Sequence, residues 1–221
     1  MLVNSDIDLI IERTKSLWNE GKIEGALEII RTAYENSPSN AVLAFEYGHM
    51  LGQLSSGKPS ELKSGWRSES IDVLAKLCEK LDGIDPIEQW KIRRHFFLYS
   101  GQHLQNRSLG YEEIKRGNHL GVLSVGFGCL HHAIDLVATN SVKEARHYAF
   151  EAKDAFKKLL EIDSPKYGRL LAYALALALL GKKQEAIAAT YKAAKLLCIR
   201  PNQLDEHNEE MNRLLRVADD H

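Results

Sequence analysis

One pattern of mostly small residues follows a glycine at two distant points of the 221-residue chain. At the first point, Gly21 is followed after five, nine and twelve residues by Ala26, Ile30 and Ala33. At the second, Gly181 is followed at the same offsets by Ala186, Thr190 and Ala193. Offsets that differ by three or four residues place side chains on one face of an α-helix. Because glycine commonly ends a helix and small side chains let helices approach closely, the pattern predicts a helix–turn–helix unit at each point.

The rest of the chain is also patterned as helix. Strand signals are nearly absent, since no alternating run of β-branched residues is longer than about five. The five prolines lie between helical patterns, where proline breaks no helical hydrogen bond. The expected helices cover residues 5–20, 23–36, 40–54, 61–81, 86–105, 111–116, 118–138, 142–163, 165–180, 183–198 and 203–218. Their short connections predict an all-α fold of antiparallel helix hairpins.

Composition limits the compartment and the class of partner. Apolar residues make up 44% and charged residues 27% of the chain, which is ordinary for a soluble protein. The formal net charge of −1 provides no overall field toward nucleic acid or an anionic membrane. The longest mostly apolar run, 120–130, is too short to span a bilayer. Three cysteines without a CxxC motif, Cys78, Cys129 and Cys198, fit a reducing cytoplasm. The expectation is a cytoplasmic protein that binds neither nucleic acid nor membrane.

Several segments resemble the 34-residue unit of tetratricopeptide-repeat (TPR) proteins. In that family W-x2-L-G-x2-Y marks the first helix, A-x3-F marks the second, and a proline closes the unit. Residues 7–40 and 167–200 match best, and 152–165, AKDAFKKLLEIDSP, matches the end of a second helix. Residues 41–54 match a first helix through Ala44, Tyr47, Gly48 and Leu51.

The resemblance implies an α-solenoid in which helix hairpins wind into a right-handed superhelix. It implies a single domain over 1–221 with units at 7–40, 41–82, 86–117 (atypical), 118–165 (elongated) and 167–200. A capping helix at 202–219 would cover the end of the stack with Leu204, Met211, Leu214 and Leu215. Helix contacts are expected at four small residues, Gly121, Gly126, Gly128 and Ala133. The glycines among them could instead allow the close approach of a ligand.

The resemblance also implies a concave groove lined by the first helix of each unit. By the family's offsets, its positions are Asp8, Ile11, Lys15 and Trp18 in the first unit and Val42, Phe45, His49 and Gly52 in the second. Trp18 fits a core position equally well. Family members that clamp a peptide carboxylate use a lysine and an asparagine at the places held here by Ile11 and Lys15. This departure argues against that clamp.

A basic and aromatic stretch, WKIRRHFFLYSGQH at 90–103, contains Arg93 and Arg94. Three interpretations are open. The charges could form the solvated face of an amphipathic helix, a patch for an acidic peptide, or contacts to nucleic acid with the aromatic rings stacked on bases. Combined with the groove positions, the peptide interpretation selects the candidate partner-binding residues Lys15, Phe45, His49, Arg93 and Arg94.

Catalytic signatures are missing from the sequence, which has no P-loop, GxSxG or HExxH motif. Its nine histidines are unusual, and His131, His132 and Asp135 cluster in one helical pattern, with His147 in the next. The i,i+4 spacing of His131 and Asp135 would let them share a zinc or iron ion or act as an acid–base pair. Alternatively, the adjacent histidines point to different faces and one hydrogen-bonds Asp135.

The sequence therefore predicts a non-catalytic scaffold or adaptor that binds another protein or a peptide and needs no metal or cofactor. Two alternatives stay open. One is a metal- or small-ligand-binding enzyme that uses His131, His132 and Asp135. The other is a structural subunit that self-assembles end to end, as solenoids can.

Overall fold

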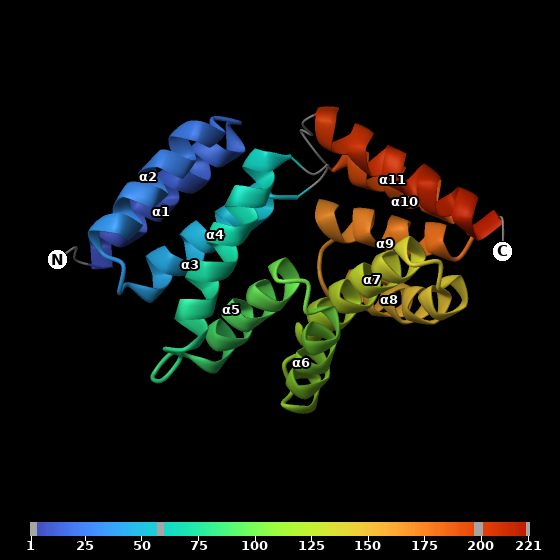
Figure 1. Ribbon diagram of the computed structural model, residues 1–221, viewed down its shortest axis with the longest axis horizontal. Helices are drawn as coiled ribbons and strands as arrows, with labels where there is room; N and C mark the ends of the chain where they lie inside the picture. The colour runs from blue at the N-terminus through green and yellow to red at the C-terminus, as the bar shows by residue number, and fades with distance from the viewer. Residues whose placement is uncertain (1–3, 57–59, 197–200, 220–221) are drawn as a thin grey trace. The chain divides into compact units, whose positions relative to one another are not determined.

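The computed structural model describes residues 4–56, 60–196 and 201–219, and every regular element in these ranges is an α-helix (Figure 1). The helices are α1 (Asn4–Asn19), α2 (Ile23–Asn36), α3 (Ala41–Leu54), α4 (Glu61–Cys78), α5 (Pro86–Tyr99), α6 (His103–Lys115), α7 (Gly121–Ala138), α8 (Val142–Ile162), α9 (Tyr167–Leu179), α10 (Lys183–Lys195) and α11 (Pro201–Asp219). Most consecutive helices, such as α1 and α2, α3 and α4, and α9 and α10, fold back on one another as hairpins, which confirms the predicted fold class. The right-handed superhelix stays a prediction.

Glycines in the left-handed conformation separate several of these helices. Gly21 between α1 and α2 has φ of 81°, and Gly181 between α9 and α10 has φ of 70°. Residues with a Cβ rarely adopt such angles, so glycine fits these turns. The patterned residues that follow Gly21 and Gly181 are buried in α2 and α10, as the repeated pattern predicts.

Two compact units divide the chain: unit 1, Met1–Ser100, and unit 2, Gly101–His221. The division falls at a break in the helix predicted over 86–105. In the structure α5 ends at Tyr99, Gly101 has φ of 76°, and α6 runs from His103 to Lys115. The prediction of one helix over 86–105 was wrong, because Gly101 ends a helix instead of continuing it. The short helix predicted at 111–116 overlaps the second half of α6.

The same break concerns the atypical unit predicted at 86–117. Its first helix, α5, packs against α4 in unit 1, and its second, α6, packs against α7 in unit 2. The two helices therefore have their main partners outside the predicted unit. That residues 1–221 form a single domain stays a prediction.

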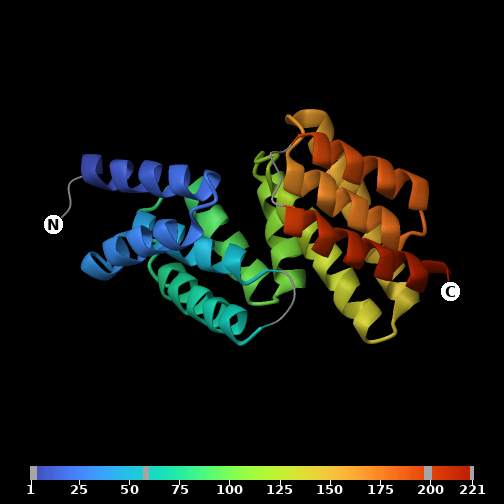
Figure 2. The ribbon, with the colours of Figure 1, turned by 90° about the horizontal axis from the view of Figure 1, so that it is seen from above.

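Unit 1 is built from the hairpins α1–α2 and α3–α4, with α5 against α4 (Figure 2). Asn40 caps α3 and Ser60 caps α4, each by accepting hydrogen bonds from backbone N–H groups of the first turn. Gly48 lets α4 approach α3 closely, and the Ser70 hydroxyl donates to the Gly48 carbonyl at 2.6 Å. These contacts hold α3 closely against α4.

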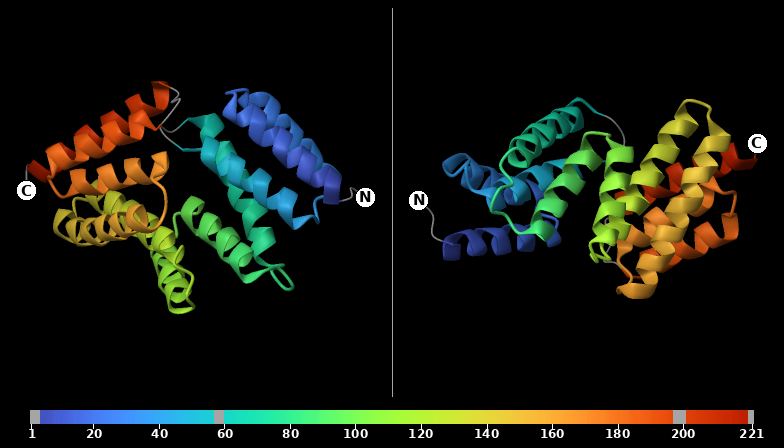
Figure 3. Two further views of the ribbon diagram at one scale, coloured as in Figure 1. Left: turned by 180° about the vertical axis from the view of Figure 1, so that it is seen from behind. Right: turned by 90° about the horizontal axis from the view of Figure 1, so that it is seen from below.

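Unit 2 is organised around α7, which packs against α6, α8 and α9 (Figure 3). A Cβ added to Gly121 or Gly128 would lie 2.5 or 2.6 Å from a backbone oxygen of α6, so the two backbones are in direct contact. Gly126 faces the ring of Phe156 on α8, and Ala133 is fully buried. The predicted packing role of these small residues is confirmed.

Among the described helices, α7 is also the one that is long and apolar enough to cross a membrane by length and composition. Its 18 residues extend well beyond the apolar run at 120–130, which corrects the expectation that no segment is long enough. Within unit 2, 56% of α7 is buried by protein, including Val125, Cys129 and Leu130. Core helices of soluble proteins pass the same test, and the packing of α7 against three helices gives its apolar side chains a place in the core.

The predicted capping helix corresponds to α11, which packs against α9 and α10 (Figure 3). Met211, Leu214 and Leu215 are buried, which confirms the apolar stripe on this helix. The side chain of Leu204 and the whole of Cys198 lie outside the described residues.

Candidate functional site

A pocket of about 190 Å³ lies between α1 and α3 in unit 1. Its apolar lining is supplied by Ile11, Trp18, Ile30 and Met50. Its polar lining is supplied by Thr14, Lys15, Glu46, His49 and Gln53. The pocket thus combines an apolar interior with hydrogen-bonding and charged groups, which is the usual make-up of a binding site.

Four of the predicted groove positions line this pocket: Ile11, Lys15, Trp18 and His49. Trp18, for which a core position was equally open, is half-buried and forms part of the pocket wall. Gly52 is different, because it is buried and a Cβ at this position would overlap the ring of Tyr99. This groove position is therefore covered rather than open.

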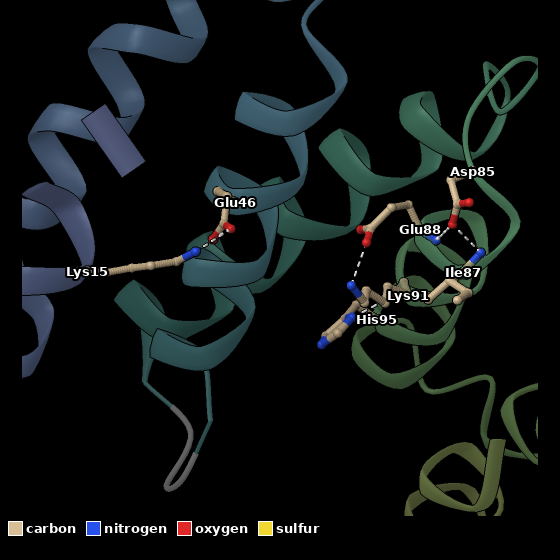
Figure 4. Close-up of polar contacts among 7 residues, drawn as sticks. All are labelled: Lys15, Glu46, Asp85, Ile87, Glu88, Lys91 and His95. Carbon is tan, nitrogen blue, oxygen red and sulfur yellow. Dashed lines mark hydrogen bonds and ion pairs between the residues drawn. The ribbon is translucent and has the colours of Figure 1, made fainter. Parts of the chain in front are cut away.

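Lys15 crosses from α1 to α3, where its Nζ lies 3.0 Å from Oε1 of Glu46 (Figure 4). The Lys15 side chain is 59% exposed and that of Glu46 is 24% exposed. Solvent-exposed pairs of this kind contribute little to stability, typically about 0–1 kcal/mol. An acidic group of a ligand can therefore compete for Lys15 at small cost.

An aromatic cluster, formed by Phe45, His49, His95 and Tyr99, joins the pocket on α3 to α5. The ring centroids of His49 and His95 are 4.3 Å apart, and Phe45 stacks on His49 with centroids 5.8 Å apart. His95 extends from α5 beside Lys91, which pairs with Glu88 (Figure 4). Since His49 also lines the pocket, the aromatic cluster continues its wall toward α5.

Hydrogen bonds determine which nitrogen carries the proton in each histidine of the aromatic cluster. His95 donates from Nδ1 to the carbonyl of Lys91 at 2.7 Å, and its Nε2 accepts from Arg94 Nη1 at 3.2 Å. His49 Nε2 accepts from the Gln53 amide at 2.9 Å, which leaves Nδ1 to donate to Tyr99 Oη at 2.8 Å. Both rings therefore use both nitrogens as neutral imidazoles.

Burial keeps the aromatic cluster uncharged. It lowers the pKa of His49 to about 4, with smaller contributions from the nearby charges of Arg94 and Lys15. Burial, reinforced by Arg94, also holds the pKa of His95 well below the ordinary histidine range, and burial raises the pKa of Tyr99. At neutral pH the site therefore presents neutral aromatic rings next to the cations Lys15 and Arg94.

The structure brings together four of the five predicted partner-binding residues. Lys15 and His49 line the pocket, Phe45 stacks on His49, and Arg94 hydrogen-bonds His95. Arg93 is exposed on another side of α5, near Cys78 of α4. Burial raises the pKa of the Cys78 thiol, and the charge of Arg93 opposes this effect in part. Successive residues on a helix do not share a face, which explains why Arg93 and Arg94 separate.

The sequence interpretation missed several residues of the site, among them Thr14, His95 and Tyr99. His95 and Tyr99 are four residues apart on α5 and therefore share a face. That spacing was visible within the 90–103 stretch, but the stretch was interpreted through its charges. Thr14 gave no such signal, because a threonine beside a lysine in a helix is ordinary at a surface.

The histidines of α7 point to two different sides of the helix. His131 stacks on His103 of α6 with ring centroids 5.3 Å apart, and His132 packs edge-on against Tyr148 of α8 at 4.6 Å. Asp135 pairs with His103, whose Nε2 lies 3.3 Å from its Oδ2. In the part of the chain that the structure describes, no group of three histidine, cysteine, aspartate or glutamate side chains is placed to hold a metal ion.

Replacing Gly52 with alanine is expected to destabilise unit 1 by about 1–3 kcal/mol, because the added methyl group must displace the buried ring of Tyr99. Urea denaturation would measure the change in the free energy of unfolding. In a Tyr99→Leu background the same substitution has more room, so we expect it to cost clearly less. Equal costs in the two backgrounds would show that Tyr99 does not constrain Gly52.

Comparison with known proteins adds little to this geometry. No protein-family model matches the chain, and no curated protein matches it in sequence. Among solved structures, the chain is similar to the TPR2AB domain of yeast Sti1 in complex with pHSP90, at 14% identity. The alignment covers 98% of this chain and 86% of that chain, with a TM-score of 0.23. A likeness of this strength carries no argument about the site.

Proposed function

We propose that the protein is a non-catalytic scaffold or adaptor whose unit 1 binds a segment of another protein. The observation that carries this proposal is the pocket between α1 and α3, with its apolar interior, the cation Lys15 and the adjoining aromatic cluster. Apolar pockets that accept one anchoring side chain, bordered by charges that orient the partner, are characteristic of protein interfaces. Lys15 and Arg94 favour a segment that carries acidic residues.

The hydrogen bonding of the site supports binding rather than catalysis. A general acid or base needs a pKa near the working pH and a nitrogen or oxygen directed at the substrate. In His49 and His95 both ring nitrogens are engaged within the protein, and burial moves both pKa values away from neutrality. These histidines are therefore suited to forming a rigid wall.

The other two interpretations gain no support from the arrangement of side chains. The α7 histidines form separate contacts with α6 and α8, which does not favour a shared metal or substrate. A cytoplasmic location is favoured by two free cysteines, Cys78 and the buried Cys129, because reducing compartments keep thiols free.

Affinity purification from the native cell tests this proposal. Reversing Lys15 and Arg94 together to glutamate is expected to weaken partner retention by about tenfold or more, since both cations border the site. The matched control reverses Lys22 and Arg93 to glutamate, which makes the same change in net charge at exposed positions outside the pocket. Circular dichroism would establish that each variant keeps its helices.

The proposed function requires a protein that wild type and the control variant retain and that the Lys15→Glu, Arg94→Glu variant loses. Equal loss from both variants would indicate that only net charge matters. Equal retention by all three proteins would exclude this face of unit 1 as the binding surface.

A further inference from the structure

A second pocket of unit 1, of about 350 Å³, lies between α2, α3 and α4. The described residues that line it all differ from those of the pocket between α1 and α3. Its volume is in the range of pockets that hold small molecules. Much of its lining is apolar or aromatic and is supplied by Tyr34, Ala44, Val73 and Leu77. The walls therefore favour a ligand with a hydrocarbon body, because removing apolar surface from water is favourable.

Two lysines of α4, Lys76 and Lys80, give this second pocket a positive charge. Both line the pocket, both are exposed and therefore accessible to a ligand, and they are four residues apart on one face of the helix. Among the described residues that line the pocket, none is acidic. Like charges at this spacing repel each other, so an anion bound beside both lysines would relieve the repulsion.

These two lysines differ from several others in unit 1. Lys15, Lys22 and Lys91 each pair with a glutamate within 3.0 Å. Neither Lys76 nor Lys80 forms an ion pair with another residue in the described part of the chain. An anionic ligand therefore has no carboxylate of the protein to displace.

The start of α3, at the edge of the second pocket, distinguishes among anions. Phosphate groups are commonly held by the backbone N–H groups at the start of a helix. Here the Asn40 side chain, which lines the pocket, already accepts from the N–H groups of Val42 at 3.1 Å and Leu43 at 3.0 Å. A phosphate would lack these donors for its several oxygens. A carboxylate carries a single charge and two oxygens, which two lysines can match.

We propose that the second pocket binds a small organic carboxylate, with its apolar body against Val73 and Leu77 and its carboxylate between Lys76 and Lys80. The inference goes beyond the proposed function, because it concerns a different pocket and a small ligand. The apolar walls and the two cations each select one end of such a molecule. A ligand that lacks either end gives up one of these two contributions.

Six-carbon probes that differ at one end test the proposal on the full chain. Methyl NMR spectra would be recorded while hexanoate, hexanol, hexylammonium or hexyl phosphate is added, with acetate as a carboxylate that lacks the apolar body. The methyl groups of Ala44, Val73 and Leu77 report binding at the pocket. We expect hexanoate to bind about fivefold or more tightly than hexanol, because two exposed ion pairs of modest strength act together. Hexylammonium, hexyl phosphate and acetate should all bind more weakly than hexanoate.

A double variant identifies the lysines as the source of the preference. Lys76→Gln with Lys80→Gln removes both charges and keeps polar side chains, so hexanoate should bind no more tightly than hexanol. The matched control, Lys157→Gln with Lys158→Gln, makes the same change in net charge at exposed positions of α8 in unit 2 and should keep the wild-type preference. Circular dichroism would establish that both variants keep their helices. If the first variant fails to fold, the comparison of the probes on the wild-type protein still decides the question.

Several outcomes would overturn the inference. Equal binding of hexanoate and hexanol would mean that the second pocket is apolar only, and equal binding of hexanoate and acetate would mean that the lysines attract any anion. Tighter binding of hexyl phosphate would assign the pocket to a phosphate ester. Equal loss of hexanoate binding in both variants would indicate an effect of net charge, and the absence of methyl shifts with every probe would exclude the pocket as a binding site. None of these outcomes decides the proposed function, which the charge-reversal purification tests through Lys15 and Arg94.

Discussion

Unit 2 is expected to lose about 2 kcal/mol or more of its free energy of unfolding when Gly121 and Gly128 are both replaced by alanine. A Cβ on Gly121 would lie 2.5 Å from the carbonyl oxygen of Gly110, and one on Gly128 would lie 2.6 Å from that of His103. These are backbone atoms of α6, so no side-chain rotation can make room. The α6 and α7 helices would have to separate along much of their contact.

Helix propensity works in the opposite direction and makes the experiment informative. Alanine is favoured over glycine in a helix interior by about 1 kcal/mol, so a site without steric conflict should be stabilised by the same substitution. Gly128 lies within α7 and would gain most of this effect, whereas Gly121 is the first residue of the helix and would gain less. A net loss therefore measures the close approach of the two backbones.

Gly168 provides the matched control within the same unit. It lies in the first turn of α9, is exposed, and has no atom within 4 Å of the place where a Cβ would be built. We expect Gly168→Ala to leave stability unchanged or to raise it by less than about 1 kcal/mol. Urea denaturation of the full chain would compare the variants. The backbone contact would be contradicted if Gly168→Ala changed the free energy of unfolding as much as the double substitution of Gly121 and Gly128 did.

Sequence patterns predicted the helices well because the signals involved are local. Helical periodicity, and glycine or proline between periodic segments, identified the hairpins whose turns contain Gly21 and Gly181. Gly101 shows the limit of this reasoning. Gly126 and Gly128 continue α7, whereas Gly101 adopts a left-handed conformation and ends α5's segment. In sequence all three lie in helical patterns, and only the packing of α5 on α4 and of α6 on α7 distinguishes them.

The candidate site was predicted in part for the same reason. The offsets along two first helices placed Lys15 and His49 in one groove, and both line the pocket. That Thr14 lines the pocket depends on how α1 meets α3, which no local pattern records. Asp135 of α7 pairs with His103 of α6, which lies 32 residues earlier in the chain. The sequence cluster of His131, His132 and Asp135 gave no sign of this partner.

Acid is expected to loosen the capping helix α11, because it must protonate a histidine that the fold keeps neutral. His207 is 8% exposed, and its Nε2 lies 3.2 Å from Thr190 Oγ1 of α10, where Met211 also packs. Burial lowers the pKa of His207 to about 4, opposed by the charge of Glu210. An unfolded histidine has a pKa of about 6.5, so the folded cap binds the proton less readily than the released cap.

The sign of the pH dependence follows from that difference. The contribution of His207 to cap stability is fully present above about pH 6.5 and is lost as the pH falls from there to about 4. A difference of this size corresponds to about 3 kcal/mol, at roughly 1.4 kcal/mol per pKa unit. Amide hydrogen exchange of α11 measures this local stability without unfolding unit 1, where His49 and His95 also have lowered pKa values.

Two variants identify His207 as the source of the effect. His207→Gln retains a side chain that can hydrogen-bond Thr190 but does not titrate, so the protection of α11 should become nearly independent of pH between 6.5 and 4. His147→Gln removes an exposed histidine from α8 and should leave the pH dependence of wild type unchanged. Arg146 donates to the Ala218 carbonyl at 2.8 Å, a contact between α8 and α11 that neither variant removes. If α11 of the His207→Gln variant still loses its protection in acid, the titrating group must lie elsewhere in unit 2.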